Sequence, residues 1–436
     1  TSSFTALRTT DETPALPRLL LPQLRQQRLL PRFQIAADDR PAGRPPESAP
    51  RGAASMPDTM PEDLPEWLVV DEILVRLPPK DVLRCRAVRK PWRAPTSTDS
   101  FILDNHRRQP SLPIIEQHGE GISCLAAAGD HKIRPVLRYS PDPVSSIAAC
   151  DGLLILSHQS GFYICNPATR KCAPLPPPPS RPGCWPPNVV AFYRHDASPR
   201  EYRVLWVFAA QMAGRTTYEP PRYFVLPVGS DQPRCIQWPT VLQSYPASSD
   251  FPPVHHRAAL HWALSLGITV LDTVTETFRH MSYPAELQGG VFSLFDLGGD
   301  PALRHTSGDC LTQDIWVLQD CDAETWAFRY RIDLRAMEAS PPLDLTVIYF
   351  APMMVAINER ELLIQHGGDC LLHCDIEGVF LGYVESQDHE SSLNRFAKRL
   401  TLTRHRLQES MISLPLFETR QEDAVHEKKP PFTIVL

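Results

Sequence analysis

Proline is the sequence feature that most restricts how this chain can fold. Forty-six of its 436 residues are proline, roughly twice the usual share in globular proteins. Each proline lacks a backbone N–H and breaks a helix interior, so an all-α bundle and a long coiled coil are excluded. Short strands joined by turns accommodate this much proline. We therefore expect a mostly β protein.

Composition and charge place the chain among soluble globular proteins. Hydrophobic residues make up 42%, charged residues 22%, and the net charge is −6, so we expect no nucleic-acid partner. The longest apolar stretches fall short of the ~20 residues that a membrane span needs, and no signal-peptide pattern opens the chain. Eleven irregularly spaced cysteines indicate reduced thiols. We expect a protein without a membrane partner, in the cytoplasm, the nucleus or both.

The first 56 residues differ in composition from the rest of the chain. They contain eight arginines, eight prolines and no lysine, and their aromatic residues are Phe4 and Phe33. Pro22 and Pro31 interrupt two leucine clusters before a long helix could form. Because such a segment has little apolar surface to bury, we expect residues 1–56 to be disordered.

A helical period follows at residues 64–77 (LPEWLVVDEILVRL). The steps between its apolar residues are four, one, four, one and three, which places them on one helical face; they are Leu64, Leu68, Val69, Ile73, Leu74 and Leu77. Pro65 suits a first turn, and Pro78-Pro79 ends the helix. A second helix is expected at residues 80–90, with Val82, Leu83, Ala87 and Val88 inward, and a third from Trp92 towards His106. Three helices in about 45 residues are marginal alone, so this unit should dock on another surface.

Residues 112–417 show a coarse repeat. Short apolar runs lead to turns that start with an acidic or amide residue, at Asn166, Asp272, Asp322 and Asp375. The later gaps are 50 and 53 residues, the first is 106, and the missing copy falls at residues 223–238. This is the period of a β-propeller blade, and about six blades fit, the last closed by strands from both ends of the domain. The alternative is an irregular β-sandwich, but the regular spacing favours the propeller.

The turn residues themselves have a structural role in this interpretation. Each side-chain oxygen can accept a hydrogen bond from an N–H two or three residues later, which fixes a tight turn between antiparallel strands. We therefore assign them no metal or catalytic role.

The helical region closely resembles an F-box, the short helical motif that docks on a Skp-type adaptor. The matching positions are Leu64-Pro65, residues 72–78 (EILVRLP), Lys80, residues 82–84 (VLR), residues 86–88 (RAV), Lys90, Trp92-Arg93 and Phe101. The later motifs CDGLLIL (150–156), YICNPATR (163–170) and LTRHR (402–406) resemble the F-box-associated domain of large plant F-box families.

The resemblance implies an α+β, multidomain chain. The F-box would occupy residues 57–106, an all-β, propeller-like F-box-associated domain residues 107–418, and a flexible tail residues 419–436. The candidate adaptor contacts are Leu64, Pro65, Ile73, Leu77, Val88 and Trp92. Pro91 and Pro95 depart from the family pattern. Since a proline inside a helix costs about 3 kcal/mol, we expect a short or irregular third helix and weaker adaptor binding.

Common catalytic and metal-binding motifs are absent from the sequence. The sequence has no phosphate-binding loop, no zinc-protease motif and no nucleophile-elbow motif. The nearest metal-like cluster is His366, Cys370, His373 and Cys374, but on a strand His373 and Cys374 would point to opposite faces. The pair His255-His256 is expected in a loop. We predict no catalytic residue, no metal and no cofactor.

The sequence thus predicts a non-catalytic substrate-recognition subunit of a Skp/cullin/F-box ubiquitin ligase. The F-box would bind the adaptor and through it a cullin, and the propeller would hold a protein substrate, which the sequence does not identify. Residues 174–187 and 209–221 are expected connectors and the best candidates for substrate contacts. Two alternatives stay open. One is an F-box protein with impaired adaptor binding that acts only as a protein-binding module. The other is a propeller enzyme such as a glycosidase, which would need two carboxylates about 5–9.5 Å apart.

Overall fold

The computed structural model describes residues 64–126, 131–139, 144–180, 183–198, 200–209, 221–239, 244, 246, 252–287, 289–343, 352–366, 370–384, 400–418 and 430–436. These residues all belong to one compact unit, Asp63–Leu436. Residues 1–56, for which the sequence predicts disorder, lie outside the described part. None of the helices in the described ranges is long and apolar enough to cross a membrane.

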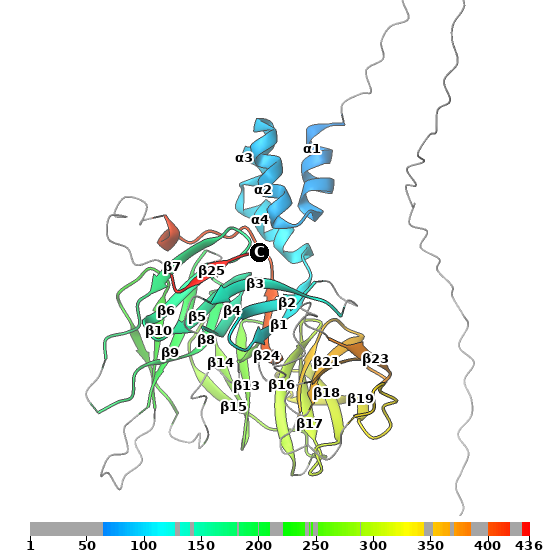
Figure 1. The fold of residues 1–436 in the computed structure, drawn as a ribbon. Helices are drawn as coiled ribbons and strands as arrows, with labels where there is room; N and C mark the ends of the chain where they lie inside the picture. Colours follow the sequence, from blue (N-terminus) through cyan, green and yellow to red (C-terminus); the bar gives the residue numbers. More distant parts are fainter. Residues whose placement is uncertain are drawn as a thin grey trace, which may run out of the picture. The chain divides into compact units, whose positions relative to one another are not determined.

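Four helical segments open the described chain (Figure 1). They are α1 (Glu66–Leu68), which continues as a π-helical stretch (Val69–Ile73) and a 3₁₀ turn (Leu74–Arg76), then α2 (Pro79–Val88), α3 (Lys90–Thr96) and α4 (Asp99–Arg108). The prediction of three helices is therefore corrected: the third helix ends at Thr96, with Pro95 inside it. A fourth helix follows because the Thr98 hydroxyl accepts the N–H of Phe101 and caps it.

The buried face of the helices differs from the predicted one. Val70, Leu74, Val75, Val82 and Phe101 share a core, whereas Leu64 and Ile73 are exposed. The wider π-helical turn at Val69–Ile73 shifts the inward face away from Ile73. Ala87 and Val88, expected inward, are exposed. They are the last two residues of α2 and lie beyond the residues of this helix that pack in the core.

Six antiparallel sheets follow the helices (Figure 1). The first sheet has the order β24 (Leu400–Gln408), β1 (Ser111–Gln117), β2 (Gly121–Leu125), β3 (Ile133–Tyr139), β25 (Phe432–Ile434). The second contains β4 (Ser145–Cys150), β5 (Leu153–His158), β6 (Gly161–Asn166) and β7 (Lys171–Leu175), and the third β8 (Asn188–Arg194), β9 (Tyr202–Phe208), β10 (Arg222–Pro227) and β11 (Arg234–Ile236). The fourth contains β12 (Val254–His256), β13 (Ala259–Leu264), β14 (Gly267–Asp272) and β15 (Phe278–Met281). The fifth contains β16 (Val291–Leu297), β17 (Asp300–Thr306), β18 (Thr312–Asp320) and β19 (Thr325–Asp333), and the sixth β20 (Met353–Ala356), β21 (Glu361–His366), β22 (Cys370–Asp375) and β23 (Phe380–Tyr383).

A hydrophobic core lies between each pair of neighbouring sheets, and the succession of cores closes into a ring. The shared cores join Ile155 to Trp206, Leu205 to Trp262, Ile268 to Leu303, Ile315 to Leu362, Leu363 to Leu137 and Leu137 to Leu156. The first sheet combines strands from both ends of the domain, as predicted. The fold is a six-bladed β-propeller, which confirms the expected architecture.

The turns between the third and fourth strands of the blades show how the repeat is built. Oδ1 of Asn166, Asp272 and Asp375 each accepts two N–H groups of the following turn, as predicted. The missing copy is the β10–β11 turn, inside residues 223–238. The assignment of Asp322 is wrong: Oδ1 of Asp320 accepts the N–H groups of Asp322 and Ala323, because β18 extends to Asp320 and the turn begins there.

Two further expectations are corrected. His255 and His256 lie in β12 and not in a loop, since Val254–His256 pairs with β13. The tail is not flexible throughout, because Phe432–Ile434 forms β25 and pairs with β3. Residues 419–429 lie outside the described part.

Candidate functional site

The helices present exposed apolar side chains at the positions where adaptor contacts were predicted. The exposed fraction is 57% for Leu64, 44% for Ile73 and 84% for Val88, and Pro65 is also exposed. An ion pair between Arg89 and Glu66, at 3.5 Å, links the end of α2 to the start of α1. Leu64, Pro65 and Val88 therefore belong to one end of the helical unit.

Leu77 and Trp92, the other two candidates, are half-buried and pack against the helical core. The Arg89 guanidinium lies over the Trp92 ring, 5.2 Å from its centroid. The prediction missed Trp67, which is 63% exposed. Trp67 lies in the single turn of α1, whereas Leu64 precedes the extended N-cap Pro65. The signal in the sequence was a tryptophan beside two predicted contacts, because tryptophan is enriched at binding surfaces.

The short third helix, α3, is held in place by hydrogen bonds to α2. The Arg86 side chain donates from Nε to Thr96 Oγ1 at 2.9 Å and also bonds the Thr96 carbonyl. Thr96 Oγ1 in turn donates to the Trp92 carbonyl at 2.6 Å. Thr96 is fully buried. These bonds hold α3 against α2 although Pro95 interrupts its hydrogen-bond ladder.

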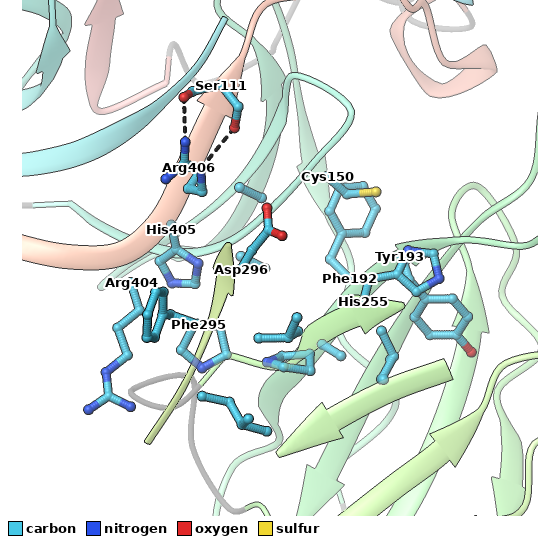
Figure 2. A pocket seen from close by; sticks show the side chains of 18 of the residues that line it. Ser111, Cys150, Phe192, Tyr193, His255, Phe295, Asp296, Arg404, His405 and Arg406 are labelled. Carbon is cyan, nitrogen blue, oxygen red and sulfur yellow. Dashed lines mark hydrogen bonds between the residues drawn. The ribbon is translucent and has the colours of Figure 1, made fainter. Parts of the chain in front are cut away.

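A second candidate site is a cavity of about 300 Å³ at the centre of the propeller, lined by residues of the innermost strand of each of the six sheets. Its walls carry both apolar and polar side chains, and Figure 2 shows Asp296, Arg404, Arg406, His255 and Cys150 around it. Burial raises the pKa of the Cys150 thiol, so this sulfur stays protonated and is a poor nucleophile.

Asp151, in the turn after β4, lies on the cavity wall where the helices meet the propeller. Its Oδ1 is 3.4 Å from His106 Nε2 of α4, and its Oδ2 lies 3.3 Å from Arg194 and accepts the Tyr202 hydroxyl at 2.9 Å. Burial alone would raise the pKa of Asp151, but the hydrogen bond from His106 and the charge of Arg194 outweigh it and hold this pKa below its ordinary value. A general acid needs the opposite shift.

Asp296 and Arg406 also have structural partners. Asp296 Oδ1 accepts the N–H of Gly299 at 2.8 Å. Arg406 donates to Ser111 Oγ at 3.0 Å and to the carbonyls of Ser111, Ala356 and Ile357, so it ties β24 to the start of β1 and the end of β20 (Figure 2).

The residues of the metal-like cluster in the sequence, His366, Cys370, His373 and Cys374, have different neighbours in the structure. His373 Nδ1 lies 3.0 Å from His131 Nε2, and its Nε2 lies 3.2 Å from Glu361. Burial lowers the pKa of His373, and both ring nitrogens are engaged. His366 pairs with Cys370 across β21 and β22. Within the described ranges, no group of three or more His, Cys, Asp or Glu side chains has the arrangement of a metal site.

Comparison with known families gives one match that covers half of the chain. Residues 130–347 match the F-box associated beta propeller domain. This range begins just before β3 and ends between β19 and β20, so it includes the second to fifth sheets of the propeller.

Three similar proteins come from Arabidopsis thaliana. F-box protein At5g49610 is 25% identical over 319 residues, which cover 68% of this chain and 86% of that protein. Putative F-box/kelch-repeat protein At1g12870 is 22% identical over 311 residues, with coverages of 61% and 70%. F-box protein At5g18160 is 24% identical over 275 residues, with coverages of 59% and 67%.

Proposed function

The chain belongs to the plant-type F-box proteins with an F-box-associated β-propeller domain, and from this we propose that it is the substrate-recognition subunit of a Skp/cullin/F-box ubiquitin ligase. Residues 57–106 act as the F-box and bind a Skp-type adaptor, and through it a cullin. Residues 107–418 bind a protein substrate. Holding both raises the effective concentration of substrate lysines near the ubiquitin-charged enzyme. Such a subunit works in the cytoplasm, the nucleus or both.

The observation that carries this proposal is the set of exposed apolar residues on the helices. Leu64, Trp67 and Val88 are each more than half exposed, on helices that pack around a shared buried core. Exposed apolar side chains gathered on a small unit mark a protein-binding surface, and tryptophan is enriched among the residues that dominate binding energy. An adaptor would cover these side chains.

We place the substrate at the end of the blades that lies away from the helices. The β4–β5 turn with Asp151 and the β6–β7 turn with Asn166 contact α4 and the segment after β24. Because the strands are antiparallel, the connections from β7 to β8 and from β9 to β10 leave from the other end of the blades. These are residues 174–187 and 209–221, which lie partly outside the described ranges. We assign substrate contacts to that end.

The two alternatives, an F-box protein with impaired adaptor binding and a propeller enzyme, would each require a specific structural feature. An F-box protein with impaired adaptor binding would be explained by Pro95 inside α3, but the Arg86–Thr96 bonds support the helix despite that proline. A glycosidase would need a carboxylic acid with a raised pKa, and the pKa of Asp151 is lowered. We therefore favour a non-catalytic role.

Binding of the full chain to a purified Skp-type adaptor tests the proposal. Val88→Glu and Leu64→Glu place a charge on exposed side chains, so the fold should persist. We expect each substitution to raise the dissociation constant at least tenfold, about 1.4 kcal/mol. Leu266→Glu, at an exposed position in the β13–β14 turn, is the matched control and should bind like the wild type. A folded chain that fails to bind, or whose binding ignores both substitutions, would overturn the proposal.

A further inference from the structure

The segment after β24 runs between the helices and the propeller. We call residues 409–414 the C-terminal strap. Met411 is buried, with 4% of its surface exposed, in the same core as Val70, Leu74, Val82 and Phe101 of the helices. The next buried residues, Ile412 and Leu414, lie in the core between the second and third sheets of the propeller. Neighbouring side chains of the strap thus enter two different cores.

Hydrogen bonds fasten the strap to the helices. His106 Nδ1 of α4 lies 3.1 Å from the Glu409 carbonyl, 303 positions away in the sequence. The side chain of Gln408, the last residue of β24, donates to the carbonyls of His106 and Gln109 at 2.9 Å each. The His106 carbonyl also accepts the N–H of Gln109, so the Gln408 amide adds a second bond to it at the C-terminal end of α4.

A second set of hydrogen bonds fastens the strap to the propeller. The amide nitrogen of Asn166 donates to the carbonyls of Ser410 and Ile412, at 3.1 and 2.9 Å. Ser410 Oγ donates to the Asp151 carbonyl at 2.6 Å. Asn166 and Ser410 are fully buried, and removing a partner from such a pair leaves a buried polar group unsatisfied.

We propose that the strap, through Met411, is a positioning element for adaptor docking: it completes the core of the helices and fixes them against the propeller. A unit this small has too little core to be stable alone, and Met411 supplies part of it from the far end of the chain. The inference rests on the proposed function for the identity of the docked partner. Its consequence is that residues near the C-terminus control a surface formed near residues 64–92.

The test compares full chains that carry Met411→Asp or Ser413→Asp. Ser413 is exposed in the same strap and is the matched control, since it receives the same charge outside both cores. Amide hydrogen exchange reports the stability of each segment separately. We expect Met411→Asp to speed exchange in α1, α2 and α4 at least tenfold, to leave β5 and β14 unchanged, and to raise the adaptor dissociation constant at least tenfold. Ser413→Asp should match the wild type in both measurements.

Two additional variants keep the test decisive. Met411→Leu keeps an apolar side chain of similar volume and should restore protection and binding. Met411→Ala is measured if the aspartate variant does not fold, and it should speed exchange selectively in the helices. Unchanged exchange in the helices of Met411→Asp and Met411→Ala would overturn the role of the strap. If the wild-type chain fails to bind the adaptor, the proposed function fails, while hydrogen exchange still decides whether the strap supports the helices.

Discussion

His106 of α4 and Asp151 of the β4–β5 turn face each other where the helices meet the propeller, with Nε2 and Oδ1 3.4 Å apart. Both residues are also bound to the C-terminal strap: His106 contacts the Glu409 carbonyl, and the Asp151 carbonyl accepts the Ser410 hydroxyl. Three segments distant in the sequence, α4, the β4–β5 turn and the C-terminal strap, therefore meet at one polar cluster, which we call the junction. Because hydrogen bonds of defined geometry hold the junction together, single substitutions there should lower the stability of the protein strongly.

Asp151→Asn should destabilise the protein by about 2–4 kcal/mol. The amide is neutral and leaves the Arg194 guanidinium without its counter-charge. It also weakens the acceptor for Tyr202 and His106. Urea denaturation followed by tryptophan fluorescence measures the change. Asp322→Asn, in the exposed β18–β19 turn, is the control and should stay within about 0.5 kcal/mol of the wild type. Equal effects of the two substitutions would contradict the assigned role of Asp151.

Asn166→Asp should be far more harmful than Asp272→Asn, although both residues start the same kind of turn. Either side chain accepts the turn N–H groups through Oδ1. Only the amide of Asn166 can also donate to the carbonyls of Ser410 and Ile412, and a carboxylate there would face two carbonyl oxygens. We expect a loss of about 3–4 kcal/mol for Asn166→Asp and less than about 1 kcal/mol for Asp272→Asn, measured by the same denaturation assay. Similar losses would show that the strap bonds contribute little.

Gly152→Ala should destabilise the junction more than Gly119→Ala does. Both glycines have a left-handed φ, +79° and +77°, so both substitutions share a backbone strain of about 1 kcal/mol. A Cβ at residue 152 would lie 2.6 Å from the Gln408 carbonyl oxygen and 2.8 Å from the Ser410 nitrogen, whereas a Cβ at residue 119 meets no atom within 4 Å. The difference between the two melting temperatures isolates the clash with the strap. A difference near zero would refute that clash.

The blade architecture could be predicted because its signals are local. In four of the blades, the turn between the third and fourth strands begins with a side chain that accepts N–H groups two to four residues later, and the spacing of these residues gives the blade period. The start of this turn was assigned to Asp322 because three acidic residues, Asp320, Asp322 and Glu324, lie close together there. The register of β18 against β19 shifts between Leu318 and Asp320, and only pairing with the neighbouring strand decides where the turn starts.

The junction could not be predicted, since its contacts join segments far apart in the sequence. Nothing near Met411 indicates that it packs against Val70 and Phe101, because an isolated methionine fits any apolar core. Val88 was expected both inward and as an adaptor contact, and the structure leaves it exposed. The helical period alone could not separate these roles, because the π-helical stretch and the strap redefine which face of the helices is covered.

The protein should lose stability on mild acidification through His261. This histidine of β13 is 1% exposed, and its Nδ1 lies 3.3 Å from the Val254 carbonyl. Burial lowers its pKa to about 4 from an ordinary 6.5, against the opposing effect of the Val254 hydrogen bond. Between pH 6.5 and 4 the unfolded chain therefore binds a proton that the folded chain does not, so the free energy of unfolding falls as pH falls. The contribution of His261 reaches about 3 kcal/mol across this window and is constant above it.

Denaturation curves measured at half-unit pH steps give the free energy of unfolding as a function of pH. Between pH 6.5 and 4 this free energy should fall less steeply for His261→Gln than for the wild type, while His118→Gln, in the exposed β1–β2 turn, should follow the wild-type curve. Parallel curves for His261→Gln and the wild type would show that this histidine does not set the acid limit of the fold.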